Sequence, residues 1–162
     1  MGTKWQGTQR ETRALDAFIA LSRAAESVAF ETSRHLASAG LTQGQFGVLE
    51  AIYHLGPLCQ KDLGEKILRT GGNMTVVVTN LERRRLVRRQ RGGADRRFVT
   101  VSLTATGRAL IQTVLPKHVR GVLKVMEALS PEEQETLRAL CRTLGLAAAV
   151  PAKTRRKPAQ PR

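Results

Sequence analysis

The chain has few aromatic residues, few cysteines and no long apolar run. Phe, Trp and Tyr make up 4% of its 162 residues, which argues against a surface of stacked aromatic rings for single-stranded nucleic acid. Two cysteines are too few for a disulfide scaffold. No apolar run approaches the roughly 20 residues of a membrane span, and the first ten residues contain no apolar signal segment. We therefore expect a cytoplasmic protein with reduced thiols and no membrane partner.

Acidic residues are also scarce, with 13 Asp and Glu against 27 Lys and Arg and a net charge of +14. Such an excess suggests duplex DNA, RNA or a membrane surface as the partner. The charge is local, however. Residues 81–97 carry eight arginines against Glu82 and Asp95, a charge of +6, and residues 151–162 carry five bases and no acid, a charge of +5. The basic character therefore belongs mainly to two short segments.

Patterns typical of catalysis and of metal binding are missing as well. The sequence contains neither a G-x-S-x-G nucleophile motif nor a phosphate-binding P-loop. Its three histidines, His35, His54 and His118, lack the short spacing of a metal site. We therefore expect no enzyme activity, no metal and no cofactor.

Apolar residues at helical spacing predict long helices at both ends of the chain. Residues 1–10 are expected to be flexible, residues 11–40 and 104–148 to be dimerisation helices, and residues 149–162 to be a disordered basic tail. A first helix of about 28 residues would be about 42 Å long, whereas a compact monomer of this size has a radius of gyration near 15 Å. A homodimer formed through the terminal helices is the simplest way to cover them.

Residues 41–103 are predicted to form a DNA-binding lobe. Thr42 and Gln45 form a capping-box pattern before one helix, and a short helix over residues 60–68 precedes another over residues 71–84. Two segments of period two, residues 86–91 and 97–103, flank a Gly-Gly-Ala-Asp turn and predict a β-hairpin. The fold class is thus mainly α with a small β-hairpin wing, a winged helix-turn-helix with N- and C-terminal dimerisation helices.

The helix at residues 71–84 has the two faces that a recognition helix needs. Its predicted buried stripe is Met74, Val77, Val78 and Leu81. The remaining outer face is polar and mostly uncharged, so its short side chains can reach base edges in a major groove. It includes Asn73, Thr75, Val76, Thr79, Asn80 and Arg83.

Several motifs resemble those of the MarR family of bacterial transcriptional regulators. They are L-T-Q-G-Q-F-G-V-L at residues 41–49, G-P-L at 56–58, L-E at 81–82, L-V at 86–87, D-R-R at 95–97 and V-S-L-T-A-T-G at 101–107. The resemblance implies a homodimer on a pseudo-palindromic operator in double-stranded DNA. It also implies a sequence-specific repressor that a small ligand or thiol oxidation releases.

The resemblance also assigns roles by position. It places Thr70, Gly72, Asn73, Thr75 and Val76 within reach of DNA, and the outer helix face adds Asn80. In the wing, Arg97 would enter the minor groove while Asp95 orients it, since a planar cation suits a narrow, negative groove. Arg88, Arg89, Arg91 and Arg96 are also expected to bind DNA, the first three at phosphates.

One residue departs from the family pattern at a position where the backbone is expected to be strained. Arg85 stands where the family usually has glycine, at a position expected to need a positive φ. A non-glycine residue there would carry a penalty of roughly 1 kcal/mol.

Two alternatives and one ligand hypothesis remain. Cys59 precedes a short helix and could make the protein a thiol-redox regulator, although Cys59 and Cys141 are both more simply structural, with Cys141 in the core. The arginine excess and the tail also suit a weakly specific architectural DNA-binding protein. An effector, if there is one, is expected between the dimerisation helices and the lobe, and an aromatic or phenolic anion would suit the basic surroundings.

Overall fold

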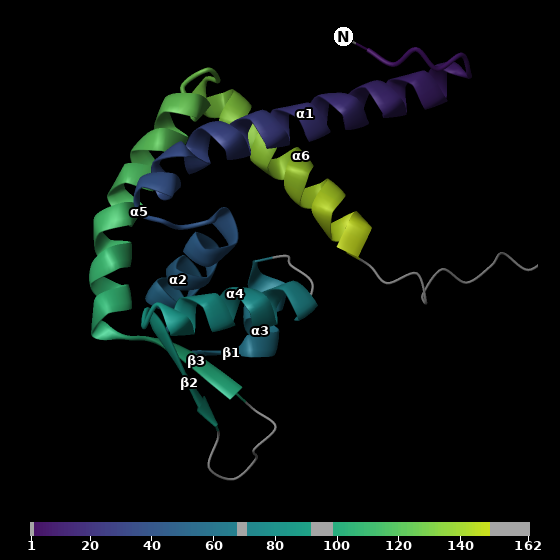
Figure 1. Ribbon diagram of the computed structural model, residues 1–162. Helices are drawn as coiled ribbons and strands as arrows, with labels where there is room; N and C mark the ends of the chain where they lie inside the picture. The colour runs from purple at the N-terminus through teal and green to yellow at the C-terminus, as the bar shows by residue number, and fades with distance from the viewer. Residues whose placement is uncertain (1, 68–70, 92–98, 150–162) are drawn as a thin grey trace, which may run out of the picture. The chain divides into compact units, whose positions relative to one another are not determined.

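The computed structural model describes residues 2–67, 71–91 and 99–149. It is mostly helical with one small sheet, which confirms the predicted fold class (Figure 1). The chain divides into two units, residues 1–125 and residues 126–162. In chain order the elements are α1 (Gln9–Ser38), α2 (Gln43–Leu55), β1 (Leu58–Cys59), α3 (Gln60–Lys66), α4 (Gly71–Arg83), β2 (Val87–Arg91), β3 (Val99–Leu103), α5 (Ala105–Met126) and α6 (Pro131–Ala149).

Side-chain caps fix where the helices begin. Thr42 Oγ1 accepts a hydrogen bond from the Gln45 amide, and Gln45 Oε1 accepts one from the Thr42 amide, so the predicted capping box of α2 is confirmed. A further capping box at Thr8 starts α1 at Gln9 rather than at residue 11. The last helix, α6, continues to Ala149, one residue past the predicted limit at residue 148.

The core of the first unit lies where α2, α3, α4 and β3 meet. Fully buried side chains come from each of these elements, among them Leu49 of α2, Leu63 of α3 and Val101 of β3. The predicted stripe of α4 is confirmed, since Met74, Val77, Val78 and Leu81 are all buried. With one face of α4 packed on this core, Val76 and Arg83 on its other side are exposed.

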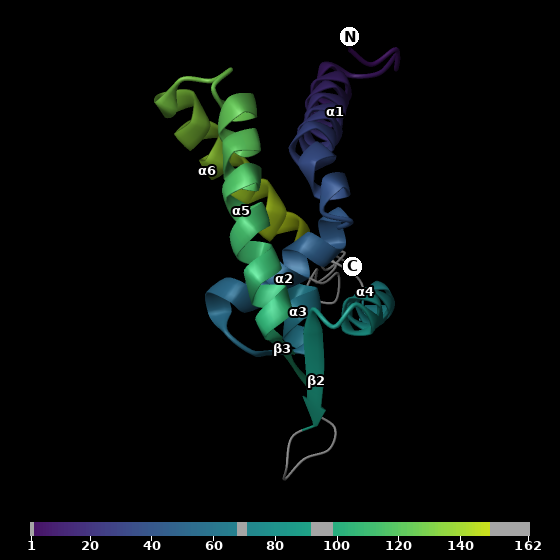
Figure 2. The ribbon, with the colours of Figure 1, turned by 60° about the vertical axis from the view of Figure 1, so that its left-hand side comes forward.

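The three strands form an antiparallel sheet in the order β1-β3-β2. The β2–β3 pairing aligns Val87 with Leu103 and Arg91 with Val99, which confirms the predicted hairpin strands. The predicted turn between them lies outside the described residues. Strand β1 was not predicted, because its two residues are too few to show a period. Figure 2 shows the hairpin strands projecting beyond α4.

A Schellman turn joins α4 to β2 and contains the predicted unusual residue. The Arg85 amide donates to the Glu82 carbonyl at 2.8 Å, and the Leu86 amide donates to the Leu81 carbonyl at 3.0 Å. Arg85 has φ of 56°, the only positive φ of a non-glycine residue within the described ranges. The prediction that Arg85 occupies a glycine-favouring position is confirmed.

The T-x-x-G part of the V-S-L-T-A-T-G motif holds that turn in place. Thr104 Oγ1 donates to the Arg85 carbonyl at 2.7 Å and accepts from the Gly107 amide at 3.0 Å, while the Thr104 amide donates to the Leu86 carbonyl. A Cβ atom on Gly107 would lie 1.9 Å from the Leu86 carbonyl oxygen. Only glycine therefore fits at position 107 with this backbone.

The terminal helices keep much of their apolar surface uncovered in the single chain. Of α1, only Thr32 and Leu36 are buried, whereas Phe18 and Phe30 are 64% and 71% exposed. Leu140 and Leu144 of α6 are exposed too, and so is Cys141, which corrects the prediction that Cys141 lies in the core. No helix in the described part of the chain is both long and apolar enough to cross a membrane.

Candidate nucleic-acid interface

The outer face of α4 presents short side chains. Val76 is 57% exposed, Thr75 and Arg83 are exposed, and Asn80 is half-buried. Gly72 and Asn73 lie in the first turn of the same helix, and Thr70 lies outside the described residues. A helix with this face has the width and the side-chain chemistry to enter a major groove.

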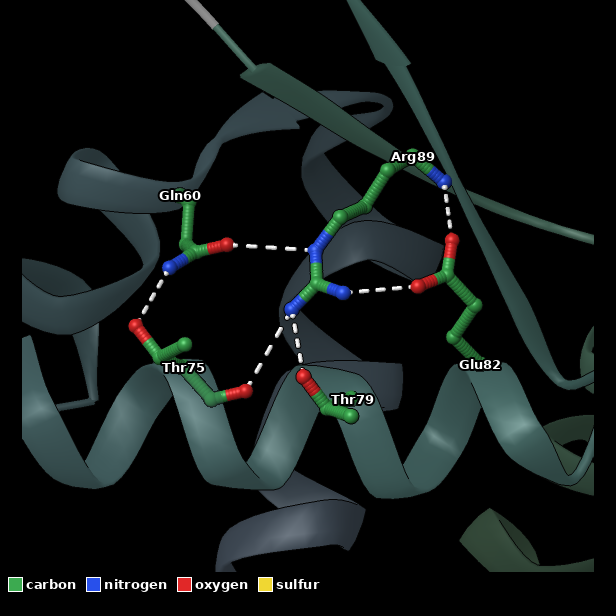
Figure 3. A network of polar contacts seen from close by, with 5 residues as sticks. All are labelled: Gln60, Thr75, Thr79, Glu82 and Arg89. Atoms are coloured by element: carbon green, nitrogen blue, oxygen red, sulfur yellow. Dashed lines mark hydrogen bonds and ion pairs between the residues drawn. The ribbon is translucent and has the colours of Figure 1, made fainter.

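Arg89 of β2 is the centre of a polar network that joins the hairpin to α4 (Figure 3). Its Nη1 donates to Glu82 Oε2 at 2.6 Å, and its amide donates to Glu82 Oε1 at 3.1 Å. Its Nη2 donates to Thr79 Oγ1 at 2.9 Å and to the Thr75 carbonyl at 3.3 Å. Arg89, expected at a phosphate, is thus bound within the protein in this structure.

The network extends to α3 through Gln60. Gln60 Oε1 accepts from Arg89 Nε at 3.3 Å, and Gln60 Nε2 donates to Thr75 Oγ1 at 2.9 Å. Sequence reasoning missed Gln60 and assigned no role to Glu82. The available signal was Glu82, one of two acids in a segment, residues 81–97, that is otherwise rich in arginine.

The other arginines of residues 81–97 have different surroundings. Arg88 is exposed and its Nε donates to Ser102 Oγ at 3.1 Å. Arg84 donates to the carbonyls of Ala39 and Gly40, which ties the end of α4 to the turn after α1. Arg91 is the last residue of β2. Three predicted wing residues, Asp95, Arg96 and Arg97, lie outside the described residues, as does the tail from residue 150.

Two histidines meet where α1, α2 and α5 come together. The rings of His35 and His118 lie 5.2 Å apart, and His118 packs on Phe46 at 4.4 Å. His35 Nε2 and His118 Nδ1 are buried and have no hydrogen-bond partner among the described residues. Burial lowers the pKa of His35, and the nearby charges of His118 and Lys117 lower it further.

Cys59 is half-buried in β1, where it pairs with Thr100 of β3 and directly precedes Gln60. It is a free thiol. Within the described ranges, no three His, Cys, Asp or Glu side chains are grouped so as to hold a metal ion.

A two-faced helix beside an arginine-bearing hairpin defines a winged-helix DNA-binding protein. The MarR family model matches residues 41–99. The HTH-type transcriptional regulator MhqR of Bacillus subtilis is 34% identical over 134 residues, covering 83% of this chain and 92% of that protein. The chain therefore belongs to the MarR family of transcriptional regulators.

Solved structures agree with this assignment. BpsR of Bordetella bronchiseptica, whose DNA binding is regulated by 6-hydroxynicotinic acid, is 26% identical, with a TM-score of 0.74 over 80% of this chain and 98% of that one. Sco3205 of Streptomyces coelicolor, a MarR family regulator solved with DNA, is 22% identical, with a TM-score of 0.81 over 94% of this chain and 96% of that one. The second likeness shows the fold.

Proposed function

We propose that the protein is a sequence-specific repressor that binds a pseudo-palindromic operator as a homodimer. The outer face of α4 carries this proposal, because its apolar stripe is buried while Thr75 and Val76 face outward beside an arginine-rich hairpin. In the proposed complex each α4 enters a major groove, and Arg97 of the wing enters the adjacent minor groove.

The uncovered helices support a dimer. Phe18 and Phe30 of α1 are large apolar side chains exposed on a surface that a soluble monomer rarely leaves open. The same holds for Leu140 and Leu144 of α6. A two-fold dimer would place its two α4 helices on half-sites about one helical turn, or ~10 bp, apart.

The histidine pair supports a site for an anionic effector. His35, His118 and Phe46 combine unpartnered ring nitrogens with an aromatic surface, at the junction of a terminal helix with the DNA-binding lobe. An aromatic or phenolic anion bound there would accept hydrogen bonds from imidazole N–H groups, and Phe46, which is 3% exposed, would have to be uncovered for the ligand to enter. The regulation of BpsR by 6-hydroxynicotinic acid is a precedent of the same chemical class. Such a ligand would weaken operator binding by favouring the conformation that does not fit DNA.

Selection of genomic fragments tests the function directly. The purified protein is mixed with sheared genomic DNA at fixed salt, and the retained fragments are sequenced. We expect a shared pseudo-palindrome with half-sites ~10 bp apart, and release of the fragments when an aromatic acid such as 6-hydroxynicotinic acid is added. Retained fragments without a common sequence would contradict the proposal.

Matched acidic substitutions separate the interface from general charge. Val76→Asp places a carboxylate on the outer face of α4 and leaves the buried stripe intact, so we expect the selection to retain nothing. Thr113→Asp adds the same charge at an exposed position of α5 and should retain the same fragments. Equal retention by the two variants would rule out α4 as the DNA-contacting element.

A further inference from the structure

Arg89 differs from the other arginines of residues 81–97 in how many of its N–H donors are hydrogen-bonded within the protein. A guanidinium has five N–H donors. The bonds to Gln60, Glu82, Thr79 and the Thr75 carbonyl engage four of them. Its side chain is 23% exposed. A side chain held in this way has little capacity left for a phosphate.

The acceptors of Arg89 come from two helices, α3 and α4, whose relative position must be fixed. Thr75, Thr79 and Glu82 follow one another along one side of α4, spaced by about one turn each. Gln60 begins α3, the first helix of the helix-turn-helix. Arg89 itself belongs to β2, so a single guanidinium connects α3, α4 and the hairpin (Figure 3).

From this geometry we propose that Arg89 is a positioning residue that sets recognition helix α4 against the wing and against α3. The ion pair with Glu82 holds α4 to β2. The bond to Gln60 turns the amide oxygen of Gln60 toward Arg89 and its NH₂ group toward Thr75, because a guanidinium can only donate. Arg89 thereby contributes to specificity by geometry, and the exposed Arg88 is left to contact phosphate. This inference rests on the proposed sequence-specific binding.

Glu82 makes the two roles of Arg89 distinguishable. If Arg89 bound a phosphate, Glu82 would compete with the DNA for it, and Glu82→Gln would raise operator affinity. If Arg89 positions α4, removing the charge of Glu82 weakens the bond that holds the helix, and Glu82→Gln lowers operator affinity. Removing a negative charge also raises the affinity for any duplex, so the ratio of operator to scrambled affinity, which falls only if Arg89 positions α4, separates the hypotheses.

The experiment measures binding of the full-length dimer to its selected operator and to a scrambled duplex over a range of salt. We expect Arg89→Met and Glu82→Gln each to reduce the ratio of operator to scrambled affinity by about tenfold or more. The salt dependence should stay the same in both. Arg89→Lys should not restore the ratio, since an ammonium cannot reproduce the planar fork.

Arg88→Met is the matched control on the same strand. It should lower the salt slope by about 0.9 per protomer while leaving the affinity ratio intact. The double variant of Arg89→Met with Glu82→Gln should be no worse than the single variants, because both remove one interaction. Circular dichroism checks that each variant folds, and sedimentation checks its dimer state. If Arg89→Met does not fold, the affinity ratio of the conservative variant Glu82→Gln decides the test.

Several results would overturn the assignment. A loss of salt slope in Arg89→Met, together with an undiminished ratio of operator to scrambled affinity in Glu82→Gln, would make Arg89 a phosphate contact. An unchanged affinity ratio in both variants would make the network irrelevant to recognition. If the unaltered protein shows no sequence preference, the proposed function fails first, which is a separate result.

Discussion

Replacing Arg85 by glycine should stabilise the protein. Arg85 has φ of 56°, and two hydrogen bonds hold it there. The Arg85 amide donates to the Glu82 carbonyl, and the Thr104 hydroxyl donates to the Arg85 carbonyl. A left-handed conformation costs a non-glycine residue about 1–2 kcal/mol. Because the turn is fixed at both sides, the backbone cannot relax away from it.

The size of the gain follows from two opposing effects. Glycine removes the left-handed penalty but adds about 0.5–1 kcal/mol of unfolded-state entropy. A net stabilisation of about 0.5–1 kcal/mol remains, which raises the Tm of a protein of this length by about 1–4 °C. Thermal unfolding followed by circular dichroism measures this gain, with protein concentration held constant because the Tm of the proposed dimer would depend on it.

Arg85→Ala is the control for charge. Alanine removes the guanidinium from a segment rich in arginine but keeps the Cβ atom and its left-handed penalty, so its Tm should not rise. An Arg85→Gly variant with an unchanged or lower Tm would refute the backbone argument. An equal gain in both variants would assign the effect to relief of charge repulsion instead.

Four further predictions concern stability, pH and DNA. Gly107→Ala should destabilise the fold by more than about 2 kcal/mol in urea unfolding, because the added Cβ meets the Leu86 carbonyl. Gly121→Ala should not destabilise it in this way, and equal effects of the two substitutions would contradict the steric argument. Folding lowers the pKa of His35, so the free energy of unfolding should be highest above pH 6.5, the ordinary pKa of histidine, and should fall as the pH drops through the lowered pKa. His35→Phe should show a weaker pH dependence, and identical pH curves for the two proteins would argue against this. Arg97→Ala should weaken operator binding with an unchanged Tm, and wild-type affinity would remove Arg97 from the groove. Deletion of residues 151–162 should lower the salt slope and keep sequence preference, and an unaltered slope would mean that the tail does not touch DNA.

Local signals were sufficient for most of the lobe. The cap at Thr42, the buried stripe from Met74 to Leu81 and the positive φ of Arg85 each depend on a few neighbouring residues. Such features are readable because the backbone demands a particular side chain at a particular spacing.

Features that depend on distant partners could not be predicted. Arg89 and Gln60 are 29 residues apart, and the sequence around neither residue indicates their hydrogen bond. The pairing of two-residue strand β1 with β3 likewise depends on the folded lobe. On the terminal helices, periodicity identified an apolar side but could not say whether the same chain would cover it, and Cys141 was misplaced for that reason.

Competition binding tests the central claim most directly. The labelled operator is bound to the full-length protein at one fixed salt concentration and displaced by unlabelled operator or by a scrambled duplex of equal length. A regulator that recognises sequence through α4 and the wing should prefer its operator by ~10³ or more. Equal competition by the two duplexes would contradict it and would favour a weakly specific, architectural DNA-binding protein.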